Sequence, residues 1–268
     1  MHIYVTSFHL LEEIMKHKML LIALVCVLVG SLGFSAGTKE TSGVKSYVFG
    51  SDCTWPPFEF IDEKGEIVGF EIDMVGEIAK RAGVEITHKN VAWDGIFAGL
   101  TNGAYDGIAS GVTVTEERKL AMDFSIPFLQ VTQTIIVNKG SEQLNSASAL
   151  SGKRVGVQIG TTGHIAMEKV AGLTIKAYDE IGLAVEDLLN KNLDAVVCDS
   201  IIAADFVLTN PNYSGKLLTT GNASNDVEDI ALVVKKGNTE LLEMLNTHIK
   251  AMQSDGTMDA LKKKWNIL

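Results

Sequence analysis

The chain has 268 residues, of which 46% are hydrophobic and 21% are charged, and its formal net charge at pH 7 is -10. This composition is typical of a globular protein with a substantial core. An acidic surface argues against nucleic acid as a partner, because binding to a polyphosphate needs a basic face. The short basic run Lys262–Lys264 lies in a helical pattern and is expected to be a solvated helix end.

The first 36 residues are predicted to be a cleavable signal peptide rather than part of the fold. The apolar run Met19–Gly30 follows Lys16–Lys18 and precedes small residues that end at Ala36. A positive, an apolar and a small-residue segment in this order are typical of an export signal, and the run is too short for a comfortable membrane span. Met15 is a candidate initiator, which would make the upstream residues a mis-called extension. Because Cys26 lies inside the apolar run, no lipid anchor is expected.

From Ser46 onward, strand and helix patterns alternate. Apolar residues recur at helical spacing from Phe70 to Ala82, and Gly83 is expected to end that helix. The other elements expected in this half are strands at 47–50, 86–91 and 105–110, a proline-containing loop at 52–60, a short helix at 96–100 and a helix that begins near residue 115.

A second series of the same kind follows the polar stretch at 141–148. The elements expected there are strands at 154–159, 174–177, 194–198 and 230–234, a turn at 160–163 that leads into a helix, and helices at 184–190, 201–208, 241–252 and 258–265. Such alternation predicts parallel sheets with crossover helices. Two series without a long linker predict two α/β lobes around a shared cleft, with ligands at the carboxyl ends of the strands.

Residues 110–118, SGVTVTEER, join the end of a strand to the start of a helix. Free backbone N–H groups at a helix start favour an anion, and Arg118 can hold a carboxylate through two parallel hydrogen bonds. A capping box made by Thr113 and Glu116 is the alternative, purely structural interpretation.

Residues 158–163, QIGTTG, form a second strand–turn–helix junction, in which Thr162 can donate its hydroxyl to the same carboxylate. The lysine of a phosphate-binding loop is missing, and no Cys or His follows metal-ligand spacing. No metal and no cofactor are therefore expected.

Residues 52–59, DCTWPPFE, place Trp55 between a strand and two prolines, where packing into a core is difficult. Loop aromatics of this kind often form a binding platform. Trp93 is a second candidate platform, and core packing is the alternative for both.

Residues 193–199, LDAVVCD, are a run of mostly apolar strand residues that ends in a carboxylate. Asp199 can accept hydrogen bonds from an ammonium group at the carboxyl end of a strand. A helix N-cap for the segment from Ile201 is the alternative.

In combination, these motifs resemble those of the periplasmic polar amino-acid-binding proteins, the extracellular solute-binding proteins of family 3. The resemblance covers about Ser46 to Trp265 and is closest to binders of arginine and other basic amino acids. The segments that carry it, in family order, are PPFEF at 56–60, GFEIDM at 69–74, VTVTEERK at 112–119, DFS at 123–125, GKRVGVQIGTTG at 152–163, LDAVVCDS at 193–200 and DGTMDALKKKW at 255–265.

The resemblance implies a type II periplasmic-binding-protein fold, in which each lobe is a mostly parallel sheet flanked by helices and two strands form a hinge. Lobe 1 is expected to comprise residues 44–130 and 229–268, and lobe 2 residues 131–228. The crossovers are expected near Phe128–Thr132 and Asn225–Asp229. Cys53 and Cys198 would then lie on opposite lobes of a moving cleft, so no disulfide between them is expected.

The resemblance also implies roles for individual residues. The α-carboxylate of a ligand would be held by Ser110, Thr113, Arg118 and Thr162, and its α-ammonium by Asp199. The ligand side chain would contact Trp55, Trp93, Asp52, Glu59 and Gln158, with the backbone offered by Gly111. The chain departs from the family pattern at Trp55, where Tyr or Phe is commoner, at Glu71, where Asp is usual, and at Glu228–Asp229, where most relatives have Tyr-Gly.

The implied function is the substrate-binding component of an ABC importer, not an enzyme. Its expected partners are a free L-amino acid, arginine first and lysine or ornithine next, and a membrane permease. The protein is expected to be an exported, periplasmic or extracytoplasmic monomer. Glutamine or another polar amino acid is the alternative ligand, and a cyclohexadienyl-dehydratase-like enzyme is the alternative function.

Overall fold

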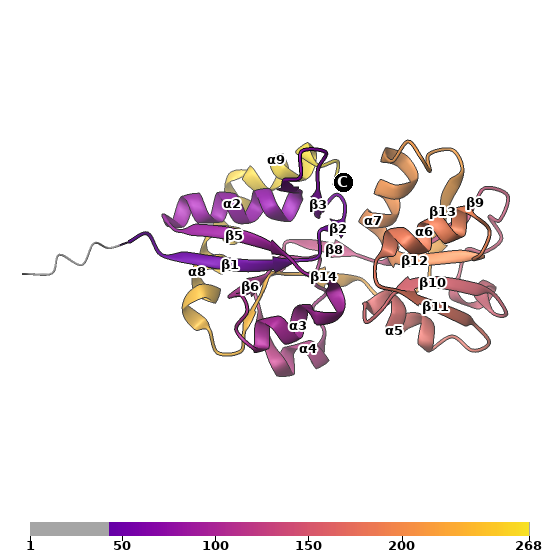
Figure 1. The fold of residues 1–268 in the computed structure, drawn as a ribbon, viewed down its shortest axis with the longest axis horizontal. Coiled ribbons are helices and arrows are strands. Elements are labelled where there is room, and N and C mark those ends of the chain that lie inside the picture. The colour runs from indigo at the N-terminus through magenta and orange to yellow at the C-terminus, as the bar shows by residue number, and fades with distance from the viewer. Residues whose placement is uncertain (1–42, 268) are drawn as a thin grey trace, which may run out of the picture. The chain divides into compact units, whose positions relative to one another are not determined.

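The computed structural model describes residues 43–267, so the predicted signal peptide at 1–36 lies outside the described residues. Within 43–267, no helix combines the length and the apolar character that a membrane crossing requires. The described residues contain two five-stranded sheets, each flanked by helices, and two smaller sheets (Figure 1). The expected α/β class is confirmed, with sheets that are mixed rather than purely parallel.

The first large sheet has the strand order β5–β1–β6–β15–β7. Strand β1 pairs in parallel with β5 and β6, whereas β15 runs antiparallel to both of its neighbours. The strands are β1 (Ser46–Ser51), β5 (Glu85–Asn90), β6 (Gly107–Ile108), β7 (Met122–Phe124) and β15 (Val233–Lys235). Along the chain, β1 and β5 are separated by a three-stranded sheet and by helix α2 (Phe70–Ala82). The strands of this small sheet are β2 (Thr54–Trp55), β3 (Glu59–Ile61) and β4 (Ile67–Val68).

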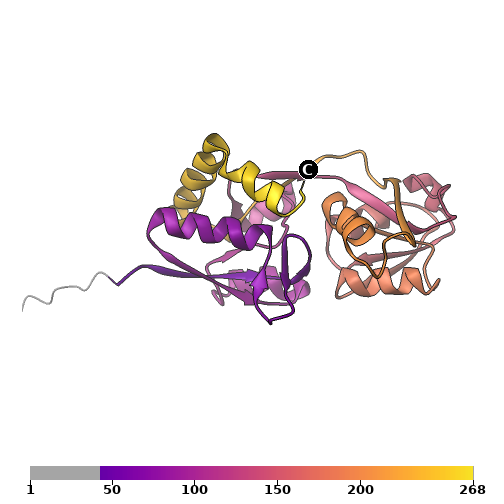
Figure 2. The ribbon, with the colours of Figure 1, turned by 90° about the horizontal axis from the view of Figure 1, so that it is seen from above.

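Amphipathic helices pack against this sheet because each must bury its apolar stripe. Helix α2 buries Phe70, Met74 and Ile78, and it ends where Gly83 adopts a left-handed φ of 67°. Figure 2 shows helices α8 and α9 lying against α2. The helices of this part are α2 (Phe70–Ala82), α3 (Trp93–Thr101), α4 (Glu116–Ala121), α8 (Thr239–Asp255) and α9 (Thr257–Lys264).

The second large sheet has the strand order β11–β10–β12–β9–β13. Strand β10 pairs in parallel with β11 and β12, and β9 runs antiparallel to β12 and β13. The strands are β9 (Gln133–Asn138), β10 (Arg154–Gln158), β11 (Thr174–Tyr178), β12 (Ala195–Asp199) and β13 (Leu217–Asn222). The helices are η1 (Ala147–Leu150), α5 (Thr162–Glu168), α6 (Ile181–Leu189) and α7 (Ser200–Ala204), which continues into the π-helical turn η2 (Asp205–Thr209).

Two short strands connect the large sheets. Strand β8 (Leu129–Val131) leads into β9, and β14 (Glu228–Ile230) leads into β15; the two pair antiparallel with each other. The sequence departure at Asp229 is accommodated in this pair, because Gln130 Nε2 donates to Asp229 Oδ1 at 2.9 Å. The first sheet draws its strands from 46–124 and 233–235 and the second from 133–222, while the lobe boundaries themselves stay a prediction.

The predicted single strand at 230–234 is wrong, because the chain changes hydrogen-bond partners inside it. The Ala231 N–H donates to the Val112 carbonyl at 3.1 Å, and the Leu232 N–H donates to the Ser125 hydroxyl at 3.0 Å. Strand β14 therefore ends before these residues and β15 begins after them. The predicted helix at 201–208 is similarly divided between α7 and η2.

Strands β9 and β13 are not among the elements predicted from the sequence. Strand β9, QTIIVN, is buried at its first five positions and lies between two neighbours. Its apolar residues form a continuous run rather than alternating with polar ones, as in strands that are covered on both faces. Such a run gives no period-2 signal from which a strand can be predicted.

Candidate functional site

Strand ends from both large sheets bring polar side chains together. Asp52 follows β1 and Ser110 lies beyond β6, while Gln158 and Asp199 are the last residues of β10 and β12. All four side chains are buried. Buried polar groups need hydrogen-bond partners, and Gln158 of the second sheet supplies one to Asp52 of the first sheet at this point.

A small cavity lies where these strand ends meet. Its volume is about 10 Å³, which is close to the minimum that holds one water molecule. A ligand of amino-acid size could enter only if the walls moved apart. The lining residues are Trp55, Trp93, Gly111, Thr113, Arg118, Thr161, Thr162 and Asp199. The predicted site residues Asp52, Glu59, Ser110 and Gln158 lie outside this lining.

Trp55 and Trp93 are stacked at one wall of the cavity. Their ring centroids are 6.4 Å apart with an interplanar angle of 25°. Trp55 Nε1 donates to Gln158 Oε1, and Gln158 Nε2 donates to Asp52 Oδ2 at 2.8 Å. Burial raises the pKa of Asp52, and hydrogen bonds from Thr54 and Gln158 oppose this rise. Asp52 is therefore joined to the aromatic pair through one amide group.

Arg118 brings a cation to the same wall. Its guanidinium carbon lies 5.5 Å from the centroid of Trp93 and 4.9 Å from that of Phe97, within the range of cation–π attraction. The guanidinium donates to the carbonyl of Thr113 at 2.9 Å and to that of Gly160 at 3.3 Å. Gly160 belongs to the second sheet's β10–α5 turn, so this side chain joins the two halves of the site.

The alternative capping box at the start of α4 is wrong. The side chain of Thr115, not of Thr113, accepts a hydrogen bond from the backbone N–H of Arg118, at 3.1 Å. Because Thr115 is the N-cap residue, the hydroxyl of Thr113 can serve another partner inside the cavity.

Two threonine hydroxyls, one from each half of the site, converge on the carboxylate of Glu228. Thr113 Oγ1 donates to Glu228 Oε2 at 3.1 Å, and Thr162 Oγ1 donates to the same oxygen at 2.7 Å. Gln133 Nε2 also donates to this oxygen at 3.1 Å, and it donates to Asp199 Oδ1 at 2.7 Å. Strand β14, which crosses between the sheets, thus places the side chain of its first residue, Glu228, in the site.

Asp199 is a buried carboxyl group that Gln133 connects to this set of hydrogen bonds. Burial raises its pKa to about 7, a hydrogen bond from Gln133 opposes the rise, and the charge of Glu228 adds to it. Arg118 favours the ionised form. A second cation close to Asp199 would complete the ionisation, because opposite charges stabilise each other strongly where water is excluded.

Two further carboxyl groups form hydrogen bonds to the Ser110–Gly111 loop. Glu71 Oε1 accepts from the Gly111 N–H at 2.9 Å, and Glu59 Oε1 accepts from the Ser110 hydroxyl at 3.2 Å. Both side chains are fully buried, and their second oxygens have no hydrogen-bond partner among the described residues. Burial raises the pKa of Glu71 to about 8 and that of Glu59 well above its usual range. Glu59 therefore supports the loop from behind rather than facing the cavity.

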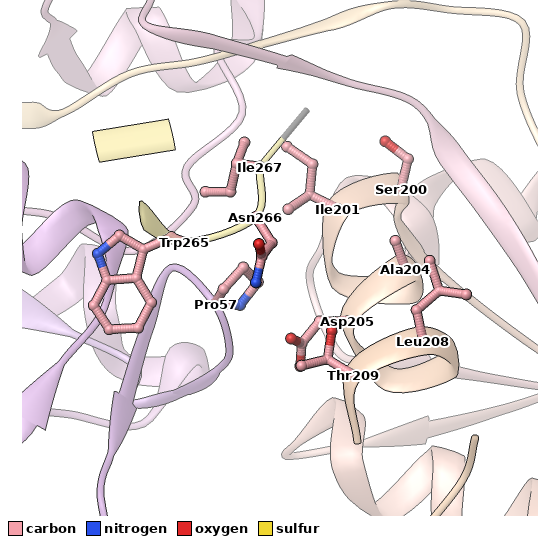
Figure 3. A pocket seen from close by; sticks show the side chains of 10 residues that line it. All are labelled: Pro57, Ser200, Ile201, Ala204, Asp205, Leu208, Thr209, Trp265, Asn266 and Ile267. Atoms are coloured by element: carbon pink, nitrogen blue, oxygen red, sulfur yellow. The ribbon is translucent and has the colours of Figure 1, made fainter. Parts of the chain in front are cut away.

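A second cavity, of about 460 Å³, lies beside α7 and η2 (Figure 3). Its volume suits a small ligand, but Asp205 is the only ionisable side chain among the described residues that line it. The other lining residues are Pro57, Ser200, Ile201, Ala204, Leu208, Thr209, Trp265, Asn266 and Ile267. Convergent charged groups, not volume, mark a polar binding site, so the small cavity is the candidate site.

Three further residues belong to the site and are not predicted from the sequence: Gln133, Thr161 and Glu228. Thr161 belongs to the QIGTTG motif at 158–163, and its position beside Thr162 is the sequence feature from which its place in the site could have been predicted. Glu228 departs from the family pattern, but it begins a crossover strand. The other predicted polar residues were found because they follow a buried strand, and Glu228 does not. Gln133 carried no local signal, since its role depends on β9 pairing with β12.

Both cysteines in the described part of the chain are free and buried, Cys53 just after β1 and Cys198 on β12. Burial raises the pKa of the Cys53 thiol to about 12 and that of Cys198 well above its usual range. Because the thiolate is the reactive form, neither residue is an activated nucleophile.

The sequence matches the model of a known family, described as bacterial extracellular solute-binding proteins, family 3, over residues 47–267. The probable histidine-binding protein of Neisseria gonorrhoeae is 32% identical over 246 residues, which are 91% of this chain and 91% of that protein. The L-cystine-binding protein TcyJ of Escherichia coli is 35% identical over 218 residues, 81% of this chain and 80% of that protein.

Solved structures are similar over most of the chain. An ancestral arginine-binding protein bound to arginine has 39% identity and a TM-score of 0.78, and the match covers 82% of this chain and 97% of that one. An ancestral arginine-binding protein bound to glutamine has 39% identity and a TM-score of 0.79, with coverage of 84% and 100%. The ancestral protein AncCDT-1, described as a precursor of cyclohexadienyl dehydratase, has 33% identity and a TM-score of 0.74, with coverage of 82% and 94%.

The buried carboxyl group of Glu71 predicts an unusual dependence of stability on pH. Its folded-state pKa of about 8 exceeds the ordinary value near 4.3 of an unfolded chain. The folded state thus retains a proton that the unfolded state releases, and stability should fall as pH rises from about 4.5 to 8. Glu71→Gln removes this titration and keeps an acceptor for the Gly111 N–H. The variant should be more stable than the wild type at pH 8 and nearly equal to it at pH 4.5.

Urea unfolding of both proteins at pH 4.5, 6 and 8 measures this difference. Glu63→Gln, an exposed carboxylate in the turn between β3 and β4, is the matched control and should not reproduce the effect. A stability difference between Glu71→Gln and the wild type that stays constant with pH would contradict the raised pKa.

Proposed function

The chain belongs to the bacterial extracellular solute-binding proteins of family 3, and we propose that it binds a free basic L-amino acid, arginine first and lysine or ornithine next. In this proposal the cleft between the two sheets closes on the ligand, and the protein acts outside the cytoplasm as the monomeric substrate-binding component of an ABC importer. The ligand is then released to a membrane permease. The protein performs no chemistry on its ligand.

The observation that carries the proposal is the hydrogen-bonded link from Trp55, one member of the stacked Trp55–Trp93 pair, through Gln158 to the carboxylate of Asp52. Two indole faces attract a planar cation through their negative π-faces, and a carboxylate beyond them can receive its N–H groups. Gln158 already donates to Asp52 with its amide N–H, so a guanidinium can replace that donor. A neutral side chain would leave the Asp52 charge without a cation.

The main-chain groups of the ligand have complementary partners in the same cavity. Arg118 with the hydroxyls of Thr113 and Thr162 offers a set of donors that suits an α-carboxylate, and the buried carboxyl of Asp199 suits an α-ammonium. Trp55 and Trp93 must separate somewhat to admit a planar group, since two van der Waals contacts of about 3.5–4 Å each need roughly 7–8 Å between the rings. This requirement agrees with binding by opening and closing of the cleft.

Glutamine is the second candidate ligand. It is favoured by the hydrogen-bonded pair Gln158–Asp52, which offers both donors and acceptors to a neutral amide, and by the similarity to an ancestral protein bound to glutamine. A glutamine side chain would use the hydrogen bonds but gain little from the two indole faces.

A dehydratase activity is the remaining alternative, favoured by Asp199. A carboxyl group with a pKa of about 7 is partly protonated at neutral pH and can act as a general acid. Incubation with prephenate, followed by the absorbance of phenylpyruvate, separates this activity from binding. Formation of phenylpyruvate that is lost in Asp199→Asn would replace the binding proposal with an enzymatic one.

Ligand identity is tested by a thermal-shift screen of the mature protein against the standard amino acids, ornithine, citrulline and cystine. A true ligand at a hundredfold excess over its Kd should stabilise the protein by about 2.7 kcal/mol. Excess arginine and lysine should also displace labelled glutamine. Asp52→Asn should weaken arginine binding more than glutamine binding, because only the cation loses a charge partner. Equal arginine affinity in Asp52→Asn and wild type would refute the cationic assignment.

Arg118→Ala should weaken arginine binding by about 3 kcal/mol, or roughly a hundredfold, through loss of a charged donor to the α-carboxylate. Titration calorimetry measures the loss, and circular dichroism verifies that the variant folds. Arg154→Ala removes an exposed arginine that pairs with Asp194 on the second sheet and should bind normally. Near wild-type affinity in Arg118→Ala would show that this residue does not hold the ligand.

Ligand affinity should depend on pH through Asp199. In the free protein this carboxyl has a pKa of about 7, and the ligand ammonium must pull it into its ionised form. Binding should therefore release a proton below about pH 7, and affinity should fall by up to about tenfold for each pH unit below that value. Calorimetry at pH 6 in buffers of different ionisation enthalpy measures the released proton. Asp199→Asn should bind weakly but with a flatter pH profile; a profile as steep as that of the wild type would assign the proton to another group.

A further inference from the structure

Glu228 is the charged residue of the site that the proposed function leaves unused. It begins β14, one of the two strands that cross between the large sheets, and its backbone pairs with Val131 of β8. Its side chain turns into the site, whereas the next side chain, Asp229, bonds to Gln130 within the pair of crossing strands. Neighbours on one strand point to opposite faces, so of these two side chains it is Glu228 that enters the site.

The Glu228 carboxylate uses the donors that a ligand carboxylate needs. One oxygen, Oε2, accepts from Thr113 Oγ1 at 3.1 Å and from Thr162 Oγ1 at 2.7 Å. These hydroxyls belong to opposite halves of the site, and their oxygens are 3.4 Å apart. A single carboxylate oxygen placed between them therefore holds both.

We propose that Glu228 is an internal substitute for the ligand α-carboxylate, and that competition between the two sets how strongly the site prefers ligands with a free α-carboxylate. This proposal rests on the proposed function for the identity of the ligand. A ligand that carries a carboxylate must displace Glu228 Oε2 from Thr113 and Thr162. A ligand that lacks one can bind while Glu228 stays in place.

Electrostatics adds to the competition. Burial lowers the pKa of Arg118 and raises that of Asp199, and the charge of Glu228 opposes the first shift and adds to the second. The Glu228 carboxylate is therefore close to both groups. An incoming carboxylate is repelled by it, since like charges in a site of low dielectric destabilise each other. After displacement, Gln133 Nε2 remains a partner for Glu228, which can swing back when the ligand leaves.

The same contacts hold the free protein closed. Glu228 Oε2 bonds to Thr113, which follows β6, and to Thr162, which begins α5. It thereby joins the first sheet's part of the site to the second sheet's part without any ligand. Removing the charge should weaken this connection and let the free protein open more often.

The test compares arginine with agmatine, which is arginine without its α-carboxylate. Calorimetric affinities of both are measured for the wild type, Glu228→Gln, Glu228→Ala and Asp229→Asn. Both Glu228 variants should bind arginine roughly ten- to a hundredfold more tightly, the range expected for a released hydrogen bond to a charged group. Agmatine affinity should change less than about twofold, because no carboxylate competes. Asp229→Asn, the matched control on the same strand, should change neither.

Three results would overturn the proposal. Weaker arginine binding in Glu228→Gln would make Glu228 a direct partner of the ligand. Equal changes for arginine and agmatine would indicate a general effect on the cleft. Unchanged affinities for both ligands in both Glu228 variants would mean that no competition exists.

A measurement without ligand separates this proposal from the proposed function. Small-angle scattering of the free proteins should give a larger radius of gyration for Glu228→Gln than for the wild type or Asp229→Asn. If the wild type binds no basic amino acid, the proposed function fails, and the scattering result alone then decides the closing role of Glu228. An unchanged radius would reject that role, and circular dichroism with thermal unfolding verifies that each variant is folded.

Discussion

The chain crosses between its two large sheets twice, and each crossing strand must leave one set of hydrogen bonds and enter another. Strand β8 leads into β9 and β14 leads into β15, and β9 and β15 each run antiparallel to both of their neighbours. Because the crossings pair with each other, the two sheets are tethered at one place. The carboxyl ends of the parallel strands β1, β6, β10 and β12 then bring Asp52, Ser110, Gln158 and Asp199 together, and β14 adds Glu228 from the crossing itself.

Burial of charge is the second constraint. Asp52, Glu59, Glu71 and Asp199 are all nearly inaccessible to water, and their pKa values are raised mainly by desolvation. Each costs stability at neutral pH unless a partner compensates. Groups of this kind gather where function requires them. These buried carboxyl groups are confined to the site and to the loop that packs against it, while the cores of both sheets remain apolar.

Sequence patterns predicted the elements whose signals are local. Helix α2 follows from its apolar period and from Gly83, and the carboxylate of Asp199 at a strand end follows from an apolar run that stops at a polar residue. Strand β10 ends at Gln158, one residue before the predicted end at Ile159. The sequence could not reveal partnerships that the fold creates. Ser110 stands next to Gly111, yet its hydroxyl bonds to Glu59 and to the Asp52 backbone. Glu228 enters the site because a crossing strand turns its side chain inward, and residue type alone does not indicate that direction.

The stacked tryptophans give the cavity an optical property of its own. The chain has three tryptophans, and two of them, Trp55 and Trp93, lie with ring centroids 6.4 Å apart on elements that flank the cavity. Indole transition dipoles at such a separation couple, and the coupling falls steeply as the rings move apart. Any event that inserts a group between them or opens the walls must therefore change the near-ultraviolet circular dichroism and the emission of the protein. The spectroscopic signals of this pair therefore report on closure of the cavity, and Trp265 contributes a third, separate chromophore.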